Sequence, residues 1–481
     1  MQTTLAPAAT YRLGFTSLDR EISVEDLPVS GSLPPWLAGS LLRNGPARFE
    51  VGTEQYQHWF DGSAMLHRFT VADGRVSYAN RFLRTPAFVE ADRLHRIACA
   101  EFGTTPHRSP LGRLAALFRP ATGDNANVNV VPYADGYLAL TESPNPVAVD
   151  GMSLETRGVV HYDDAVAGQV TTAHTHHDRS RRATFNIVIE FGRTCIYKVV
   201  RIEDGTLRRV VVAELAVDQA AYLHAFATTE RYVVVAEYPL VVRPLDLLLQ
   251  RKPFIENYRW LPGRGTRFHV FHKDGGGAAG SFEGDAFFAF HHINAFEEGG
   301  AIVLDIAAYG DASVIGDLAL ERVRDARCTI ARPAFRRFRL IPGRSAAEIE
   351  NILPQTIELP RVAARYEAAD YRYVYGVDTE GTYGMSNRLV KLDLGGRNTV
   401  AWTAPHAYPG EPVFVERPGG TDEDDGVVLS VVLDAEAAAS YLVALDARDF
   451  TELARVHVPH HIPFGFHGTF RSQPRASSTI V

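Results

Sequence analysis

Short stretches rich in β-branched and aromatic residues recur along most of the chain. Most are about 5 to 9 residues long, and turn signals such as DG, NG, GG and PG separate them. They cover residues 127–133, 136–142, 184–191, 195–202, 208–215, 232–240, 301–309, 371–377, 388–394, 427–434 and 440–446. This spacing is typical of a β-barrel, sandwich or propeller rather than of alternating strands and helices. The letters contain no exact repeat, so periodicity does not choose among the three.

Helical patterns are few and short, and they occupy residues 111–118, 243–250 and 314–324. The first two lie in segments that combine apolar with basic residues, 109–120 and 239–260. We expect these two segments either to lie as amphipathic helices in a membrane interface or to pack against the protein body.

The bulk composition is that of a soluble globular protein, with 46% hydrophobic and 22% charged residues. The formal net charge of -8 argues against nucleic acid as a partner. Cys99, Cys195 and Cys328 are far apart in the sequence, which predicts neither a disulfide framework nor a thiolate zinc site. The N-terminal residues do not resemble a secretory signal. We therefore expect a cytoplasmic protein, either free or peripheral on a membrane.

Four of the eighteen histidine positions are singled out by their apolar, strand-like surroundings. They are His174 in AHTHHD, His224 in YLHAFATT, His291 in FHHIN and His467 in GFHGTF. A single histidine on a strand is usually a satisfied core or surface residue. Several buried imidazoles at strand ends, however, need hydrogen-bond partners or a shared metal to offset their desolvation. An all-nitrogen site suits iron, copper, nickel or zinc, and there is no HExxH or zinc-finger spacing.

His291 and His292 are adjacent within an apolar run. Neighbouring side chains on a strand point to opposite faces, so the two rings are not expected to serve the same buried site. At most one of them is predicted to carry chemistry.

The histidine clusters, in this order, resemble those of the carotenoid cleavage oxygenase family. The resemblance covers nearly the whole chain and includes GSLLRNGPARFEVG, WFDGSAMLHRF, RFLRTPAFVEAD, EFGTT, GDNANVNV, YLALTESPNPVAVD, EPVFV and DEDDGVVLSVV. RFLRTPAFVEAD, EFGTT and FHHINAFEEGG are more similar to the branch with animal β-carotene oxygenases than to the plant branch. The resemblance implies an all-β, seven-bladed propeller with a cap of helices and loops over an iron-containing top face. Residues 1–481 would form this single domain, with about residues 1–20 as an extended arm.

The same resemblance implies that His174, His224, His291 and His467 bind one Fe(II) per chain, with O2 as co-substrate. The family register places a ligand three residues before Asn294, which selects His291 and leaves His292 on the outer face of its strand. The family usually reads AHPH where this chain reads AHTH, so Thr175 alters the turn beside one ligand.

Further residues are assigned by position in the family motifs. Glu142, Glu358 and Glu411 match glutamates that hold the outer N–H groups of the ligands, although an isolated glutamate is more often a surface residue. Thr141 matches a residue beside an open iron coordination site. Phe102 is expected either to line the substrate tunnel or to pack in the core.

The resemblance implies Fe(II)- and O2-dependent cleavage of one double bond of a carotenoid or apocarotenoid to two carbonyl products. The favoured position is the central 15,15′ bond, which yields retinal, and the runner-up is eccentric 9′,10′ cleavage. Stilbene-cleaving relatives carry a lysine just before the LALTE segment, where this chain has Tyr137. The alternatives from other classes are a non-catalytic lipid-binding propeller and an isomerase-hydrolase acting on retinyl esters.

Overall fold

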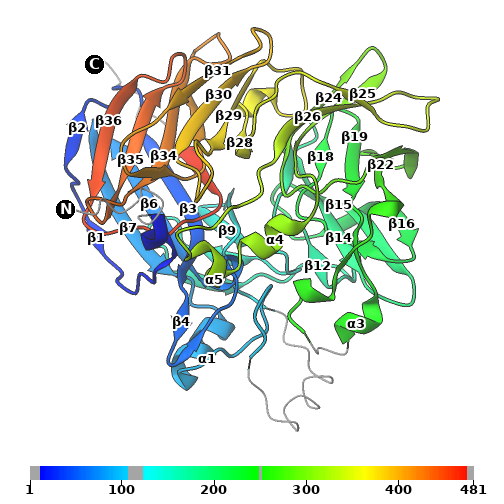
Figure 1. The fold of residues 1–481 in the computed structure, drawn as a ribbon, viewed down its shortest axis with the longest axis horizontal. Helices are drawn as coiled ribbons and strands as arrows, with labels where there is room; N and C mark the ends of the chain where they lie inside the picture. The colour runs from blue at the N-terminus through cyan, green and yellow to red at the C-terminus, as the bar shows by residue number, and fades with distance from the viewer. Residues whose placement is uncertain (1–10, 107–122, 249–251, 474–481) are drawn as a thin grey trace.

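The computed structural model describes residues 11–106, 123–248 and 252–473. Antiparallel sheets stand around a common centre in this part of the chain (Figure 1). Every segment that the sequence predicts as β-rich contains a strand, because β-branched and aromatic side chains fit a pleated, half-buried surface. The prediction of an all-β propeller is confirmed.

Seven sheets of the described chain have four to six strands. In hydrogen-bonding order, the first sheet contains β1 (Ser23–Val24), β7 (Arg75–Phe82), β6 (Ser63–Ala72), β3 (Gly39–Arg48) and β37 (Gly468–Ser472). The second contains β11 (Thr156–Val159), β10 (Val147–Val149), β9 (Gly136–Leu140) and β8 (Asn129–Tyr133). The third contains β12 (Val170–Thr171), β14 (Ala183–Glu190), β15 (Cys195–Glu203) and β16 (Arg209–Val217), with β13 (His176–Asp178) also paired with β14.

The next three sheets each have four strands. They are β18 (Ala227–Thr228), β19 (Tyr232–Glu237), β22 (Thr266–His272) and β23 (Ala278–Gly284); β24 (His292–Glu298), β25 (Ala301–Ala308), β26 (Ala334–Leu340) and β27 (Glu348–Glu350); and β28 (Glu358–Arg361), β29 (Tyr373–Asp378), β30 (Arg388–Asp393) and β31 (Asn398–Trp402).

The seventh sheet contains β2 (Val29–Gly31), β36 (Glu452–Val458), β35 (Ala439–Asp446), β34 (Gly426–Asp434) and β32 (Ala407–Pro409), with β33 (Val413–Glu416) also on β34. Two smaller sheets are β17 (Ala220–Ala221), β20 (Leu240–Val242) and β21 (Arg259–Trp260), and β4 (Glu50–Val51) with β5 (Glu54–Gln55). Because these smaller sheets accompany the larger ones, the blade number of seven stays a prediction.

The two ends of the chain share sheets, which joins the last part of the ring to the first. The C-terminal strand β37 pairs with β3, and the N-terminal strand β2 pairs with β36. These pairings cover strand edges that would otherwise be exposed.

Helices are short and lie between the sheets. The α-helices are α1 (Pro86–Leu94), α3 (Pro244–Leu248), α4 (Ser313–Asp317) and α5 (Leu320–Val323), and the 3-10 helices are η2 (Tyr11–Phe15), η3 (Trp59–Asp61), η4 (Ile255–Asn257), η5 (Pro262–Arg264) and η6 (Ala364–Tyr366). In Figure 1, α4, α5 and the loops beside them cross the middle of the ring, as expected of a cap of helices and loops. Across the described ranges, no helix is long and apolar enough to cross a membrane.

Two expectations about local structure differ from what is observed. Residues 11–15 form a 3-10 helix with Tyr11 and Phe15 fully buried, rather than part of an extended arm, because both aromatic rings pack into the core. The segment 239–260 is only partly helical, since its first apolar residues form the buried strand β20. The segment 109–120 lies outside the described residues, and so do residues 1–10 of the predicted arm. The single-domain assignment stays a prediction.

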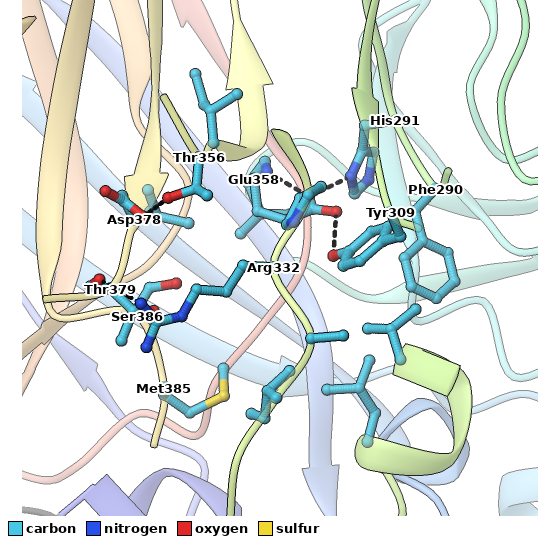
Figure 2. Close-up of a pocket in the computed structure, with 18 of the residues that line it drawn as sticks. Phe290, His291, Tyr309, Arg332, Thr356, Glu358, Asp378, Thr379, Met385 and Ser386 are labelled. Carbon is cyan, nitrogen blue, oxygen red and sulfur yellow. Dashed lines mark hydrogen bonds and ion pairs between the residues drawn. The ribbon is translucent and has the colours of Figure 1, made fainter. Parts of the chain in front are cut away.

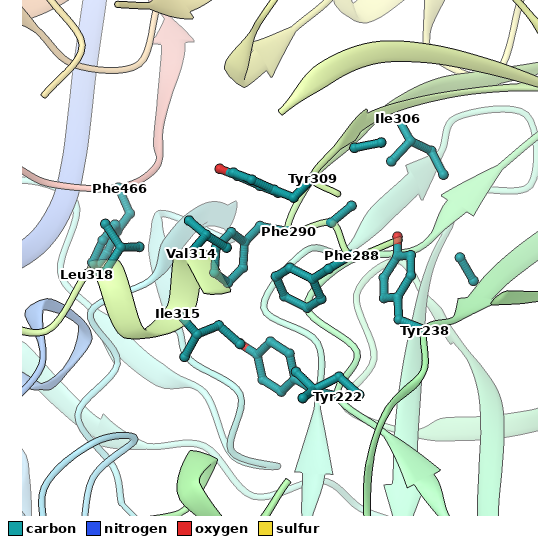
Figure 3. Packing of buried hydrophobic residues seen from close by; sticks show 14 of the residues in the cluster. Tyr222, Tyr238, Phe288, Phe290, Ile306, Tyr309, Val314, Ile315, Leu318 and Phe466 are labelled. Carbon is teal, nitrogen blue, oxygen red and sulfur yellow. The ribbon is translucent and has the colours of Figure 1, made fainter. Parts of the chain in front are cut away.

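The largest buried cluster lies beside the centre of the ring. Figure 3 shows Tyr222, Phe288, Phe290, Tyr309 and Phe466 gathered with the aliphatic residues of α4. Strand β25 runs through this region with all eight residues buried, which explains its near-continuous apolar sequence. The cluster forms the apolar surroundings of the site described next.

A close backbone approach holds the C-terminal segment in place. A Cβ atom at Gly45 would lie 2.4 Å from the Cα atom of Gly465, so neither position has room for a side chain. Hydrogen bonds on both sides connect the strands, from the Phe466 amide to the Asn44 carbonyl and from the Asn44 amide to the His467 carbonyl, each 2.9 Å long. The sequence thus positions His467 through glycines two residues before it and on β3.

Candidate metal centre

The fold brings the four predicted histidines together, although they are roughly 50, 67 and 176 residues apart. Each comes shortly before a short or edge strand: His174 before β13, His224 before β18, His291 before β24 and His467 before β37. One nitrogen from each ring lies within 4.8 Å of the others. Equivalent strand ends of a propeller point toward one axis, which is why distant segments converge here.

The nitrogen atoms are arranged as a set of metal ligands. The Nε2 atoms of His174 and His224 lie 3.1 Å apart, and so do those of His291 and His467. Burial lowers the pKa of His467 to about 3, and burial together with the neighbouring imidazoles holds the pKa of His174 well below its usual value. Neutral rings present lone pairs, which repel at this distance unless a proton or cation lies between them. The four residues therefore fit a metal that accepts imidazole nitrogen.

Three of the rings are held from behind by carboxylates. The Nδ1–H group of His224 donates to Glu142 Oε1 over 2.6 Å, that of His291 to Glu358 Oε2 over 2.5 Å, and that of His467 to Glu411 Oε1 over 2.7 Å. A carboxylate only accepts hydrogen bonds, so it fixes the proton on Nδ1 and leaves Nε2 free for a metal.

Glu411 is the most enclosed of the three carboxylates, with 1% of its surface exposed. It accepts hydrogen bonds from Arg43 Nη1 (2.5 Å), Arg361 Nε (2.8 Å) and the backbone amide of Gly468 (2.9 Å). Burial acts to raise the pKa of Glu411, but Arg361, His467 and Arg43 more than offset it and lower this pKa far below its usual value. Glu411 is therefore a carboxylate that orients His467 and forms ion pairs with two arginines.

A narrow apolar cavity opens beside the nitrogen atoms. Its volume is about 120 Å³, and its lining includes His224, His291 and His467. Aromatic and aliphatic side chains form most of the remaining wall, among them Phe60 and Ile357. Figures 2 and 3 show further members of this wall: Phe290, Tyr309, Val314, Leu318 and Phe466. A wall of this kind favours an apolar, slender ligand.

A second, larger cavity of about 1070 Å³ lies on the other side of α4. Val314 and Leu318 face the narrow cavity, whereas Ile315 and Ala319 face the larger one. The helix region thus forms part of both walls.

Comparison with known proteins identifies the family. Residues 15–472 match the family described as retinal pigment epithelial membrane protein. A chloroplastic carotenoid cleavage dioxygenase 8 homolog A of Oryza sativa subsp. japonica is 35% identical, with 94% of this chain and 86% of the relative covered. A β,β-carotene 15,15′-dioxygenase of Mus musculus is 29% identical, with 92% and 88% covered. The chain belongs to the carotenoid cleavage oxygenase family.

The fold of this carotenoid cleavage oxygenase family member agrees with that of a solved relative. A Synechocystis apocarotenoid oxygenase mutant superposes with a TM-score of 0.88 at 28% identity, covering 98% of this chain and 100% of the other. The predicted family and the prediction of an oxygenase enzyme are confirmed. The rice and mouse relatives have comparable identities, so placement within the animal branch stays a prediction.

Two tyrosines support the carboxylates and were not predicted. The hydroxyl of Tyr222 donates to Glu142 and that of Tyr309 donates to Glu358, each over 2.7 Å. Tyr222 stands two residues before His224, so strand alternation could have placed both on one face. Tyr309 has no comparable local signal, because it follows β25, which pairs with β24 beside His291, and reaches Glu358 on β28.

The remaining predicted residues differ in how the structure places them. Among the described residues, no carboxylate is hydrogen-bonded to His174, so this ring lacks the support that the other three have. Thr141 directly precedes Glu142, and its role beside a metal stays a prediction. Phe102 packs against His58 and Phe60, with ring centroids 5.0 and 5.2 Å apart. Phe60 lines the narrow cavity and His58 lines the larger one, so Phe102 packs behind the walls of both. Its role in a substrate tunnel stays a prediction.

His291 and His292 contact different groups, as the alternation of side chains predicts. His291 is the residue directly before β24 and turns toward the other three histidines, whereas His292 begins the strand. The Nε2 atom of His292 lies 2.9 Å from the hydroxyl of Tyr238, and burial lowers the pKa of His292 to about 3. His292 is thus a neutral residue that packs against Tyr238 and not against the other three histidines.

Proposed function

We propose that this protein is an iron dioxygenase that cleaves a carotenoid or apocarotenoid at the central 15,15′ double bond to give retinal. The observation that carries the proposal is the set of four imidazoles that turn Nε2 atoms toward one point beside an apolar cavity. The names of the relatives supply the reaction class and the polyene substrate class.

The chain's own residues have separable roles in this proposal. His174, His224, His291 and His467 hold one Fe(II), which when bound supplies the activation of O2. With no carboxylate among the four ligand positions, a bound metal would keep its positive charge for binding O2, and Thr141 would lie beside it. Glu142, Glu358 and Glu411 keep the Nε2 atoms aimed at the metal by holding the Nδ1 protons.

The cavity wall acts on the polyene. Phe60, Phe290 and Phe466 exclude water and hold the flat conjugated chain so that one double bond faces the histidines. The position of this bond along the chain sets the products. Support for the central bond comes from the sequence resemblance to animal β-carotene oxygenases and from the mouse relative's name.

Product analysis under labelled oxygen tests the reaction. Purified protein loaded with Fe(II) should contain about one iron per chain and convert β-carotene to retinal, with one ¹⁸O atom from ¹⁸O₂ in each aldehyde. Chromatography of products from a panel of β-carotene, apocarotenals, stilbenes and retinyl esters identifies the bond that is broken.

Each alternative gives a distinct result in the same assay. Aldehydes of unequal length mean 9′,10′ cleavage, and phenolic aldehydes mean stilbene cleavage. A retinoid alcohol without label means an isomerase-hydrolase. Folded protein that retains no iron and releases no product contradicts the oxygenase proposal and favours a non-catalytic lipid-binding propeller.

The segment 239–260 supports a second proposal, peripheral contact with a membrane. Leu245 on α3 is 65% exposed, and exposed Arg259 lies in the same segment. We expect the wild-type protein to sediment with vesicles that contain anionic lipid, because apolar and basic side chains together favour the interface. Leu245→Asp should reduce the bound fraction, whereas Met152→Asp, at an apolar residue outside the segment that is even more exposed (85%), should not. Equal binding by both variants would exclude this contact.

A further inference from the structure

The narrow cavity beside the histidines changes from apolar to polar along its length. Near the histidines its wall is formed by rings such as Phe290 and Tyr309. On the opposite side, Arg332, Thr379 and Ser386 line it, and Figure 2 shows these three grouped together, apart from His291. The polar group has no part in holding the metal ligands.

Arg332 carries a charge that no neighbouring carboxylate neutralises. Its Nη1 atom donates to the backbone carbonyl of Thr379 over 3.1 Å, and its Nη2 atom donates to the carbonyl of Gly381. Over the described parts of the chain it takes part in no ion pair. A guanidinium has five N–H donors, so these two bonds leave donors available.

Asp378, a carboxylate that also lines the cavity, is already engaged. Asp378 pairs with the guanidinium of Arg388 and accepts hydrogen bonds from Thr356 and from Gln355 Nε2, the latter over 2.8 Å. Its charge is balanced by Arg388, so Arg332 gives this side of the cavity a net positive charge.

The size of the cavity affects what binds well against Arg332. A volume of about 120 Å³ is well below the roughly 300 to 1,000 Å³ of common ligand pockets, so a chain end that lies against Arg332 displaces the water around it. A hydrocarbon end would desolvate the guanidinium without offering an acceptor. A terminal carbonyl or carboxylate accepts charge-assisted hydrogen bonds from it.

We propose that Arg332, with the hydroxyl groups of Thr379 and Ser386, binds the oxygenated linear end of an apocarotenoid whose polyene extends to the four histidines. The inference rests on the proposed polyene-cleaving function and narrows the substrate class from carotenoids in general to apocarotenals and apocarotenoic acids. Arg332 is a specificity residue here, because it contacts the substrate end and not the bond that breaks.

Binding to metal-free protein tests the proposal independently of catalysis. Trp59 lines the cavity, so a bound polyene should quench its fluorescence. Arg332→Gln should raise the Kd for an apocarotenoic acid by about 10- to 100-fold, the range expected for loss of a hydrogen bond to a charged group. Arg332→Lys should recover part of this loss, since it retains the charge but not the planar fork.

Two controls make the result specific. The Kd for β-carotene should change less than about twofold in Arg332→Gln, because the hydrocarbon has no acceptor. Arg75→Gln removes an exposed arginine paired with Asp26 and should leave every Kd unchanged. In the iron-loaded enzyme, Arg332→Gln should raise KM for the acid and leave kcat nearly the same.

The outcomes separate the two proposals. Equal effects of Arg332→Gln on the acid and on β-carotene, or no effect on either, overturn the role of Arg332. If wild-type protein binds the acid in an Arg332-dependent way but cleaves no polyene, the end-group site stands and the oxygenase proposal fails.

Discussion

His291→Ala should remove bound iron and abolish polyene cleavage, whereas His292→Ala should keep both. His291 is one of the four converging nitrogen donors, and its Nδ1–H is held by Glu358 at 2.5 Å. Losing a group that only supports a ligand typically costs about 10- to 100-fold in metal affinity or activity, and losing the ligand itself should cost more. Iron content per chain and initial rate of β-carotene loss measure both effects.

The neighbouring variant is a matched control because the two residues are adjacent and of the same type. His292→Ala loses the contact between Nε2 and the Tyr238 hydroxyl and leaves a gap at the start of β24. We expect it to lower the free energy of unfolding by about 1 to 3 kcal/mol, the cost of leaving a buried polar partner unsatisfied. Equal loss of iron from both variants would show that His291 is not the ligand.

Glu411→Ala should have the second large effect, in this case on both stability and metal content. Its removal leaves Arg43 buried with no carboxylate partner and removes one from Arg361. Breaking a buried ion pair by deleting one partner typically costs about 3 to 5 kcal/mol. His467 also loses the acceptor of its Nδ1–H group. Urea unfolding of metal-free protein measures the stability term without the contribution of bound metal.

Glu142→Gln is the control variant that separates the effect on stability from the effect on metal binding. Glu142 orients His224 and accepts a hydrogen bond from Tyr222, and no ion pair with an arginine or lysine involves it in the described residues. This variant should lose about 10- to 100-fold in iron affinity. Its unfolding midpoint in the metal-free state should stay close to that of the wild type. A midpoint for Glu411→Ala that equals the one for Glu142→Gln would mean that the two arginines do not depend on Glu411.

The charge arrangement explains why three glutamates in equivalent positions are expected to respond differently. Glu358 has the Tyr309 hydroxyl and the Leu359 amide as additional donors, which together with His291 lower its pKa despite burial. Glu411 has two arginines instead. Neutral donors therefore hold Glu358, whereas charged arginines hold Glu411. The ion pairs of Glu411 also stabilise the packing between β3, β28 and the C-terminal segment.

The strands and the candidate ligands were accessible from the sequence because their signals are local. β-branched runs such as residues 301–309 and 427–434 predict strands without knowledge of their neighbours. The four histidines are marked by their apolar surroundings. The family motifs around Glu142, Glu358 and Glu411 predict that these residues hold the outer N–H groups of the ligands, and the structure shows which histidine each one contacts. Adjacent His291 and His292 could be told apart by strand alternation combined with the family register.

Other features depend on contacts between segments far apart in the chain, and local patterns carry no information on these. Arg43 and Arg361 meet at Glu411 from β3 and β28, and Tyr309 reaches Glu358 from the end of β25. The apolar start of the segment 239–260 matches both a surface helix and a buried strand, and its pairing as β20 with β17 and β21 selected the strand.

By itself, the sequence determined an all-β chain with four histidines in strand-like surroundings and three candidate carboxylates to support them. The tertiary structure alone decided that the Nε2 atoms meet within 4.8 Å. It also decided that, among the residues that the structure describes, His174 has no carboxylate partner and Arg332 lines the cavity without a counter-charge. The physical reason is that secondary structure follows from neighbouring residues. The positions of the histidine nitrogen atoms and of the Arg332 charge depend instead on how the sheets of a propeller place distant strand ends around one axis.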